Sequence, residues 1–431
     1  MEHEKRIKKT DEIKKPKKRI KKTNILLLLA LISILIYPTF SLVKVSANKI
    51  KSPTIKTEKV KTNLTELTIY GNHLNLVGDL KIDTPLDKVT IFFSNSKNKL
   101  EIDPIYEIID GTLKFKLSEE INSGFIMDNM KVGNYQLYLK TYNKDIIKFY
   151  KINNKTNYNK TTYYTVTNKK KRKEITITQK DTLNIAVKPT NKEVYDIVID
   201  PGHGGTDSGA CFNNVCETDY TLNLSKTLKK NLQKKGYKVK LTREENKTLN
   251  TYGKNSRTGI PYEAKAKFLL SIHLNSGPNI GGFEFYAPYN ADYTFAKKLV
   301  ENIEKIDDMN ASPSTFNRVS SGVYSRTMAD YDLKNIEKEA INKNYTPYDI
   351  VSNQTNYYYI IRETGGYMSG AYIDSREENG NPYVKRNTGI ESYILELGYI
   401  TNINDIKNVE KNESKYMEVI ANSIDQYLLH N

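Results

Sequence analysis

The chain has 431 residues, a length that excludes a single hydrophobic core, so two or three folded units are expected. Its formal net charge is +16, from 66 Lys and Arg residues against 50 Asp and Glu residues. Much of this excess is local, because residues 1–23 carry eleven basic and four acidic side chains.

A long uncharged stretch follows this basic tail. Ile25 to Val43 contains 19 residues without a charge, long enough to span a bilayer although Pro38 interrupts it. Positive residues before such a segment keep the N-terminal end in the cytoplasm. The small residues Val45-Ser46-Ala47 also fit a signal-peptide cleavage site. Residues 24–47 are therefore predicted to be a transmembrane anchor or a cleaved signal peptide.

The rest of the chain is then expected outside the cytoplasm, either anchored to the plasma membrane or secreted. Its remaining positive charge indicates a solvated surface or attraction to a polyanion. Outside the membrane a nucleic acid partner is not expected, and an anionic polymer of the cell wall fits better.

Residues 48–62 are polar and basic, which is typical of a linker. Residues 63–190 contain many short runs of Ile, Val, Thr and Tyr separated by turn residues, and no helical periodicity. This pattern predicts an all-β sandwich domain, with an immunoglobulin-like topology as one option. His73 is isolated there, and we expect it to be a surface or turn residue. The predicted strands are Leu64–Tyr70, Leu74–Ile82, Val89–Phe93, Leu113–Leu117, Tyr135–Tyr142, Ile146–Tyr150, Thr162–Thr167, Ile175–Thr178 and Leu183–Val187.

The periodicity changes after Thr190, and residues 191–431 read as an α/β domain. A strand at 197–200 is followed by a helix at 219–235, in which Leu224, Leu228 and Leu232 recur at helical spacing. The next strand, 237–241, completes a βαβ unit, so we expect a mostly parallel twisted sheet with flanking helices. Further predicted strands are 268–272, 283–286, 357–361 and 393–395, and further predicted helices are 293–306 and 413–429.

Three of these strands end in side chains that bind metals or move protons. His203 follows the first strand within Asp-Pro-Gly-His-Gly-Gly, and the glycines leave its imidazole accessible. His273 and Glu396 lie at the ends of two other strands. Open α/β sheets bind their ligands at the carboxyl ends of their strands. Each residue alone could be structural, but together they predict a metal site.

A catalytic zinc ion takes three protein ligands and leaves one position for water. His203 and His273 supply two ligands, and Glu217, which precedes the helix after the first strand, is the best candidate for the third. Bound zinc lowers the pKa of water to about 7, which makes hydroxide available at neutral pH. Glu396 is our candidate for the general base that takes a proton and passes it to a leaving nitrogen.

These residues and their order resemble a known family, the zinc-dependent N-acetylmuramoyl-L-alanine amidases of type 3. The similar segments are Ile199–Gly205, Glu217 before a Leu-rich helix, Leu241-Thr242-Arg243, Ser271–Asn275 and Leu395–Asn402. The resemblance covers about residues 194–430 and implies a phosphorylase/hydrolase-like α/β fold. It implies one Zn²⁺ per chain bound by His203, Glu217 and His273, with Glu396 as the catalytic carboxylate. The implied reaction cleaves the amide between N-acetylmuramic acid and L-alanine of the peptidoglycan stem peptide.

Some positions of the catalytic region have open roles or depart from the family. Arg243 and Arg257 match common family arginines, and with Asn275 they are candidates for substrate contact or for support of the metal ligands. The family commonly has Asn and Asp where this chain has Tyr262 and Lys267. We interpret both as packing or helix-end positions, so zinc binding should survive.

The interval between His273 and Glu396 is longer than a minimal catalytic domain needs, so roughly 307–385 is an insertion. It contains a charged, helix-like piece at 331–343. Some family members carry an inhibitory helix in this interval. One hypothesis is that the insertion gates the site through Glu337 or Glu339, and the other is that it forms a surface elaboration or a wall of the substrate groove.

Cys211 and Cys216 are the only two cysteines of the sequence. An exported protein can form a disulfide here, which would stiffen the approach to Glu217. Free thiols and metal ligation are the alternatives.

The leading hypothesis is thus a zinc amidase acting on peptidoglycan, with a protein activator as a further candidate partner. A zinc peptidase cutting peptide bonds of the same polymer is the second reading. A wall-binding protein with a silent site is the third.

Overall fold

The computed structural model describes residues 55–70, 73–119, 124–154, 161–166, 171–179, 181–306, 309–343, 352–370 and 389–430. Within these ranges no helix is long and apolar enough to cross a membrane. The basic tail, the anchor or signal segment and residues 48–54 of the linker predicted above lie outside the described residues.

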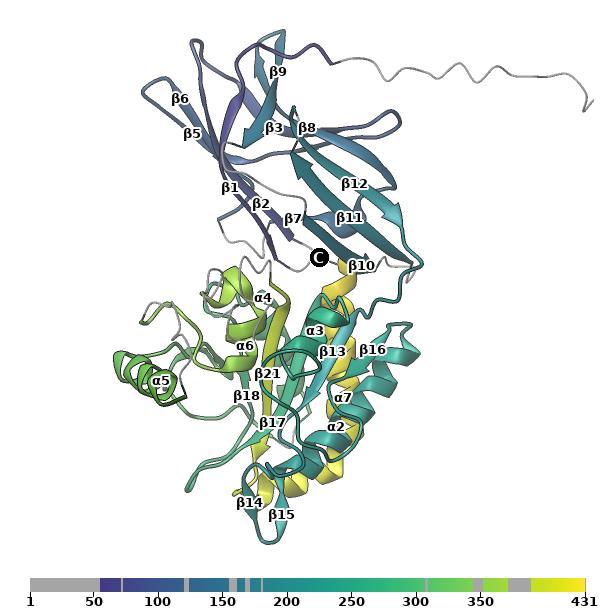
Figure 1. Ribbon diagram of the computed structural model, residues 1–431, viewed down its shortest axis with the longest axis vertical. Coiled ribbons are helices and arrows are strands. Elements are labelled where there is room, and N and C mark those ends of the chain that lie inside the picture. The colour runs from purple at the N-terminus through teal and green to yellow at the C-terminus, as the bar shows by residue number, and fades with distance from the viewer. Residues whose placement is uncertain are drawn as a thin grey trace, which may run out of the picture. The chain divides into compact units, whose positions relative to one another are not determined.

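The region from Thr62 to Pro189 consists of strands and one short 3-10 helix in its described part (Figure 1). Its strands follow the order β10-β11-β12-β8-β9-β1-β2-β6-β5, with β3 paired to β4 and β8, and β7 paired to β2. Each predicted strand has a counterpart, whereas β4, β5 and β7 were not predicted. The strands are β1 Thr62–Tyr70, β2 His73–Lys81, β3 Lys88–Ser94, β4 Lys99–Ile102, β5 Ile105–Ile109, β6 Thr112–Lys116, β7 Phe125–Ile126, β8 Gly133–Asn143, β9 Ile146–Asn154, β10 Thr161–Val166, β11 Arg172–Gln179 and β12 Leu183–Pro189, with the 3-10 helix η2 at Met127–Asn129.

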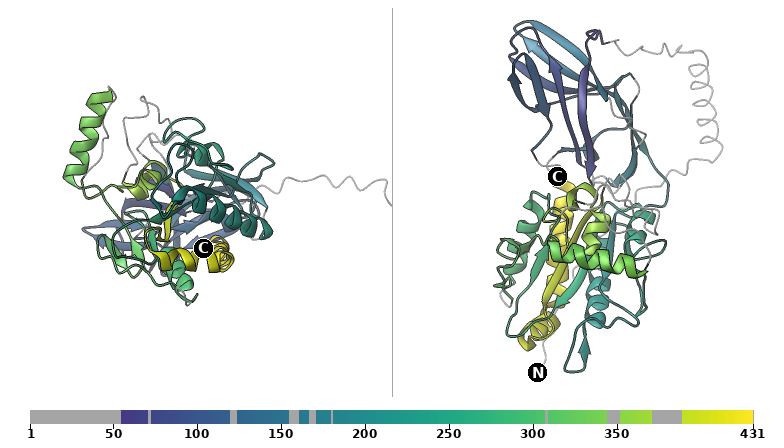
Figure 2. Two further views of the ribbon diagram at one scale, coloured as in Figure 1. Left: turned by 90° about the horizontal axis from the view of Figure 1, so that it is seen from below. Right: turned by 60° about the vertical axis from the view of Figure 1, so that its left-hand side comes forward.

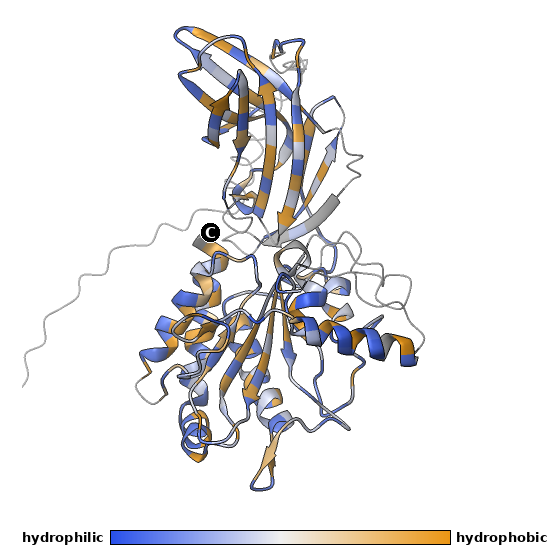
Figure 3. Ribbon diagram, turned by 90° about the vertical axis from the view of Figure 1, so that its left-hand side faces the viewer, coloured by the Kyte–Doolittle hydropathy of each residue, from blue (hydrophilic) through white to orange (hydrophobic). Residues whose placement is uncertain are grey.

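Hydrophobic side chains of these strands meet in one core, which includes Leu76, Phe93 and Ile185. Strands coloured by hydropathy show alternating orange and blue bands, as expected when one face packs inward and the other meets water (Figure 3). The expectation for His73 is wrong. Its side chain is 2% exposed, and its Nε2 lies 3.5 Å from Oε1 of the buried Glu391.

The catalytic region is built on a seven-stranded sheet of order β16-β13-β17-β21-β18-β20-β19 (Figure 1). The first four strands are mutually parallel, but β18 runs antiparallel to β21, and β19 antiparallel to β20. The α/β class is therefore confirmed. The sheet is parallel from β16 to β21 and becomes mixed from β18 onward. The strands are β13 Ile197–Pro201, β16 Val239–Leu241, β17 Phe268–Asn275, β18 Glu284–Tyr286, β19 Arg318–Ser320, β20 Val323–Tyr324 and β21 Glu391–Tyr399, with a separate hairpin of β14 Cys211–Phe212 and β15 Val215–Cys216.

Helices cover both faces of this sheet, which explains its nearly continuous hydrophobic strands. Alternate residues of β13 divide between two cores, with Ile197 and Ile199 in one and Val198 in the other. Helices α2, α4 and α7 contribute to the first core, and α3 and α6 to the second. The helices are α2 Glu217–Lys234, α3 Gly259–Glu263, α4 Thr294–Glu304, α5 Asp330–Lys343, α6 Tyr359–Thr364 and α7 Ile403–His430, with the 3-10 helix η3 at Gly366–Ser369.

The strand predicted at 357–361 is wrong, because this segment enters helix α6. Its run of Tyr and Ile has strand-like composition, but a short apolar run does not distinguish a strand from a buried helix. Here Ile360 and Ile361 are buried against the sheet as one face of a helix. The charged helix predicted at 331–343 is present as α5, which stands away from the sheet (Figures 1 and 2).

Candidate metal centre

The loop after β13 presents His203 at the carboxyl end of the sheet. His203 has a φ of +57°, a left-handed conformation that is uncommon for a non-glycine residue. Its Nδ1 lies 2.8 Å from Oδ2 of Asp207, four residues later in the same loop. A carboxylate on one ring nitrogen fixes the tautomer and leaves the other nitrogen available to a metal.

Glu217 opens helix α2, and its side chain is only 3% exposed. Its Oε2 is 3.0 Å from His203 Nε2, and its Oε1 is 2.8 Å from His273 Nδ1. The backbone N–H of Leu274 also donates to Oε1. Burial by itself raises the pKa of Glu217, but hydrogen bonds and charge from the two histidines outweigh burial and hold it far below its usual range.

Two glycines make room for the rings. A Cβ on Gly202 would come within 2.4 Å of the His273 ring, and a Cβ on Gly209 within 2.6 Å of Glu217 Oε2. Gly209 also has a φ of +66°, in the region that favours glycine. The glycines of the Asp-Pro-Gly-His-Gly-Gly motif and of the loop after it therefore let the side chains of the site approach one another closely, and they also leave the imidazole of His203 accessible.

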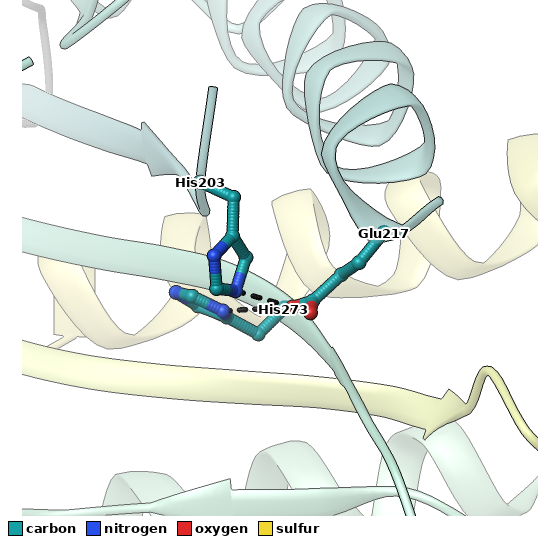
Figure 4. A group of neighbouring side chains, drawn as sticks. All are labelled: His203, Glu217 and His273. Carbon is teal, nitrogen blue, oxygen red and sulfur yellow. Dashed lines mark hydrogen bonds and ion pairs between the residues drawn. The ribbon is translucent and has the colours of Figure 1, made fainter. Parts of the chain in front are cut away.

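The three predicted ligands converge in the structure. Both imidazole rings point at the carboxylate of Glu217 (Figure 4), and one ligand atom from each residue lies within 4.8 Å of the others. Two imidazoles and one carboxylate, with a second carboxylate behind His203, form a donor set that suits zinc. The residues present therefore fit the metal that the resemblance implies.

Glu396 approaches the same place from the next strand. Its Cα is the register partner of His273 across the parallel pair β17–β21. The side chain is 9% exposed, and its Oε2 has no hydrogen-bond partner among the described residues. Burial, followed by the nearby charges of Glu217 and Glu284, raises the pKa of Glu396 well above its usual value.

An open pocket of about 520 Å³ lies over these groups. Its wall includes all three candidate ligands and Glu396 from the sheet edge, with Tyr358 and Tyr359 from the insertion. Asn275 also lines the pocket, and its Nδ2 donates to Oε2 of Glu284 over 3.0 Å.

Arg243 and Arg257 lie behind the site and are not among the residues that line this pocket. Arg243 is buried, and its Nη2 donates to the carbonyls of Gly202 and Thr218. Arg257 pairs with buried Asp200 at 2.8 Å and donates to the carbonyl of His203. Both guanidinium groups therefore hold the backbone that presents His203.

The two departures from the family pattern have contacts of their own. The hydroxyl of Tyr262 donates to the carbonyls of Glu363 and Thr364 at the C-terminal end of α6. Lys267 is buried and forms an ion pair with Asp128. Neither side chain lines the pocket, which agrees with the interpretation of both as packing positions.

Cys211 and Cys216 form a disulfide that closes the β14–β15 hairpin. The backbone N–H of Glu217, directly after the hairpin, donates to the carbonyl of Ala210 directly before it. The covalent link and this hydrogen bond together fix the point from which Glu217 enters the site.

The described part of the insertion reaches the pocket through α6 and not through α5. Glu337 on α5 is exposed and does not line the pocket, and the side chain of Glu339 lies outside the described residues. For Glu337 this geometry favours the hypothesis of a groove wall over that of a glutamate at the metal.

Sequence reasoning missed two acidic residues at the site. Asp207 could have been found, because a carboxylate four residues after an exposed histidine in a glycine-rich loop can reach its ring. Glu284 lies within an apolar strand and gave no such signal. It is buried, it is the register partner of Glu396, and it accepts hydrogen bonds from the hydroxyls of Tyr286 and Tyr399.

The fold and this site define a class of α/β protein with a candidate His-Glu-His metal centre, and comparison with known proteins identifies the family. The family model of the N-acetylmuramoyl-L-alanine amidases, Amidase_3, matches residues 197–426, which is more than half of the chain. The chain belongs to the N-acetylmuramoyl-L-alanine amidase family.

Individual relatives match the chain over part of its length or at low sequence identity. The probable cell wall amidase LytH of Staphylococcus aureus is 36% identical over 114 residues, covering 25% of this chain and 36% of LytH. The chain therefore matches about a third of the length of that relative. Among solved structures, the amidase AmiC2 of Nostoc punctiforme is 22% identical, with a TM-score of 0.35, covering 56% of this chain and 99% of AmiC2. The catalytic domain of CwlV from Paenibacillus polymyxa is 20% identical, with a TM-score of 0.36, covering 55% and 98% respectively.

Proposed function

We propose that this chain is a peptidoglycan hydrolase that cleaves the amide between N-acetylmuramic acid and L-alanine of the stem peptide. The observation that carries the proposal is the convergence of His203, Glu217 and His273 beside Glu396, within the segment that matches the amidase family. In the reaction a water oxygen adds to the carbonyl carbon, the C–N bond breaks, and the nitrogen leaves with one proton.

His203, Glu217 and His273 would hold one zinc ion. Bound zinc would polarise the amide carbonyl and lower the pKa of water to about 7. The hydrogen bond that His203 Nδ1 donates to the carboxylate of Asp207 orients that ring toward Glu217 and the pocket. Arg257 and Arg243 keep the His203 backbone in its left-handed conformation through the carbonyls that they bind.

Glu396 would move the proton. It is the one pocket carboxylate without a hydrogen-bond partner among the described residues, so its lone pairs remain available to the attacking water. Burial and neighbouring negative charge raise the pKa of Glu396, which makes its carboxylate a stronger base toward the water and lets it hold the proton until the leaving nitrogen takes it. Asn275, held by Glu284, is positioned for substrate contact at the pocket wall.

The cellular setting is part of the proposal. Residues 24–47 would export the chain as an anchor or a signal peptide, placing the enzyme on the cell-wall side of the plasma membrane. The β region at 63–190 would act as an accessory domain, and the excess positive charge would favour anionic wall polymers. A protein activator remains a candidate partner.

The test compares zinc binding and peptidoglycan digestion by the full chain with those of a Glu396→Gln variant. The proposal predicts one zinc ion in both proteins and release of stem peptides by the wild type alone. New N-termini within the stem peptide would instead indicate the peptidase. If the chain binds no zinc and releases no products, the result would indicate a wall-binding protein with a silent site.

A further inference from the structure

Arg326 belongs to the insertion, between β20 and α5, and lies outside the segments that resemble the family. Its guanidinium carbon is 3.5 Å from the centroid of the Tyr357 ring, with Phe316 at 5.6 Å and Tyr358 at 5.8 Å. Phe316 is 65% exposed, so this aromatic cluster reaches the surface. A guanidinium stacked on a ring is held in orientation while the N–H groups at its edge stay free.

Those N–H groups have no carboxylate partner in the part of the chain that the structure describes. Arg326 forms no ion pair with any described residue. The charge of Asp332 acts on Arg326, but the Oδ2 of Asp332 already accepts the backbone N–H of Ala329. A half-buried arginine that is oriented by aromatic rings and has no anionic partner among the described residues is suited to bind one from outside.

Arg326 is also tied to the wall of the catalytic pocket. Its carbonyl accepts the backbone N–H of Tyr357, and its guanidinium interacts with the hydroxyl of Tyr358. Tyr358 and the following Tyr359 line the pocket together with His273 and Glu396. Arg326 itself does not line the pocket, but it contacts Tyr358, which does.

We propose that Arg326 binds a carboxylate of the stem peptide and so selects substrates in which the residue after L-alanine keeps its free acid. The proposal rests on the amidase function proposed above. With the scissile amide at the metal centre, the peptide beyond L-alanine must follow one wall of the pocket. The planar fork of arginine matches a carboxylate with two parallel hydrogen bonds, which the corresponding carboxamide cannot accept in the same way.

The test uses the full chain loaded with zinc and two soluble muropeptides that differ only after L-alanine, one with a free carboxylate and one with a carboxamide. We expect the wild type to prefer the acid by about tenfold or more in kcat/KM. Arg326→Gln should reduce this ratio to about one, and Arg326→Lys should give an intermediate ratio, because lysine keeps the charge but loses the fork. Arg318→Gln, an exposed arginine on β19, should keep the wild-type ratio.

The outcomes separate the two proposals. If the wild type cleaves both substrates and Arg326→Gln lowers both rates equally, the arginine is structural and this inference is overturned while the amidase function stands. If the wild type cleaves neither substrate, both proposals are overturned. Melting temperatures of the four proteins identify any variant that fails to fold, and Arg326→Lys then provides the comparison.

Discussion

His273 and Glu396 are Cα register partners across the parallel strands β17 and β21. This pairing places a candidate metal ligand and a candidate proton acceptor side by side at one edge of the sheet, although they lie 123 positions apart in the sequence. Side chains alternate between the two faces of a strand, so a shift of one residue would move Glu396 to the opposite face. The register of this strand pair therefore sets the geometry of the proposed reaction.

Replacing Glu396 by Gln should remove hydrolysis without removing the metal. The amide keeps the size of the side chain but cannot take a proton, so we expect kcat to fall by about 10²–10⁴-fold. Zinc content should stay at one per chain, because the candidate ligands His203, Glu217 and His273 are untouched. Peptide release and metal analysis on the same samples check both points, and a variant that keeps wild-type activity would remove Glu396 from the mechanism.

Asp207→Asn should weaken zinc binding although Asp207 is not a proposed ligand. Its carboxylate holds the Nδ1 of His203 at 2.8 Å, and loss of such a partner typically lowers metal affinity about 10–100-fold. Competition with a fluorescent chelator measures the affinity. Asp145→Asn, at an exposed turn between β8 and β9, is the matched control and should bind zinc as the wild type does. Equal affinities in all three proteins would refute the orienting role.

Arg257→Gln should destabilise the catalytic region. It leaves Asp200 as a buried charge without its ion-pair partner, a change that costs about 3–5 kcal/mol of unfolding free energy. Arg257→Lys keeps the charge and should lose less stability, yet still bind zinc more weakly, because the contact with the His203 carbonyl is lost. Denaturant unfolding and zinc titration test this. A lysine variant with wild-type zinc affinity would show that the contact does not position His203.

Removing the disulfide should have a modest effect on stability. Cys211 and Cys216 close a very short loop, for which the chain-entropy relation gives about 2 kcal/mol. The double Cys→Ser variant should therefore lose about that much unfolding free energy and should retain zinc through the remaining Ala210–Glu217 backbone hydrogen bond. Complete loss of zinc would mean that the hairpin is held mainly by its covalent link.

Acid should weaken the β region through Glu101. Burial raises the pKa of Glu101, but hydrogen bonds from Lys140, Tyr142 and Thr90 outweigh burial and lower it. A lowered folded pKa gives stability that is present above the unfolded value of about 4.3 and is lost as pH falls through the folded pKa. The melting temperature of the wild type should therefore exceed that of Glu101→Gln at pH 7, and the difference should shrink toward pH 3. Glu66→Gln, an exposed control, should show no such trend.

Much of the site was predictable because its residues are marked by local sequence. The glycines around His203, the strand before His273 and the Leu-rich helix predicted just after Glu217 are all short-range signals, and the parallel sheet brings strand ends together. The strong hydrophobic periodicity of α2 and the alternation in most β-region strands made those elements visible in the same way.

What the sequence did not reveal depends on distant packing. The Tyr357–Ile361 run has the composition of a strand, and only its burial against the sheet makes its second half the start of helix α6. Glu284 became apparent only when β18 was seen paired with β21. His73 is buried beside Glu391, a residue more than 300 positions away in the chain.

The most direct test of the central claim is hydrolysis of peptidoglycan by the zinc-loaded full chain in water enriched in ¹⁸O, followed by mass spectrometry of the products. The account predicts one ¹⁸O atom in the lactyl carboxylate of N-acetylmuramic acid, stem peptides with a free N-terminal L-alanine, and intact glycan strands. Label in a carboxylate within the stem peptide, or in a new glycan reducing end, would contradict it.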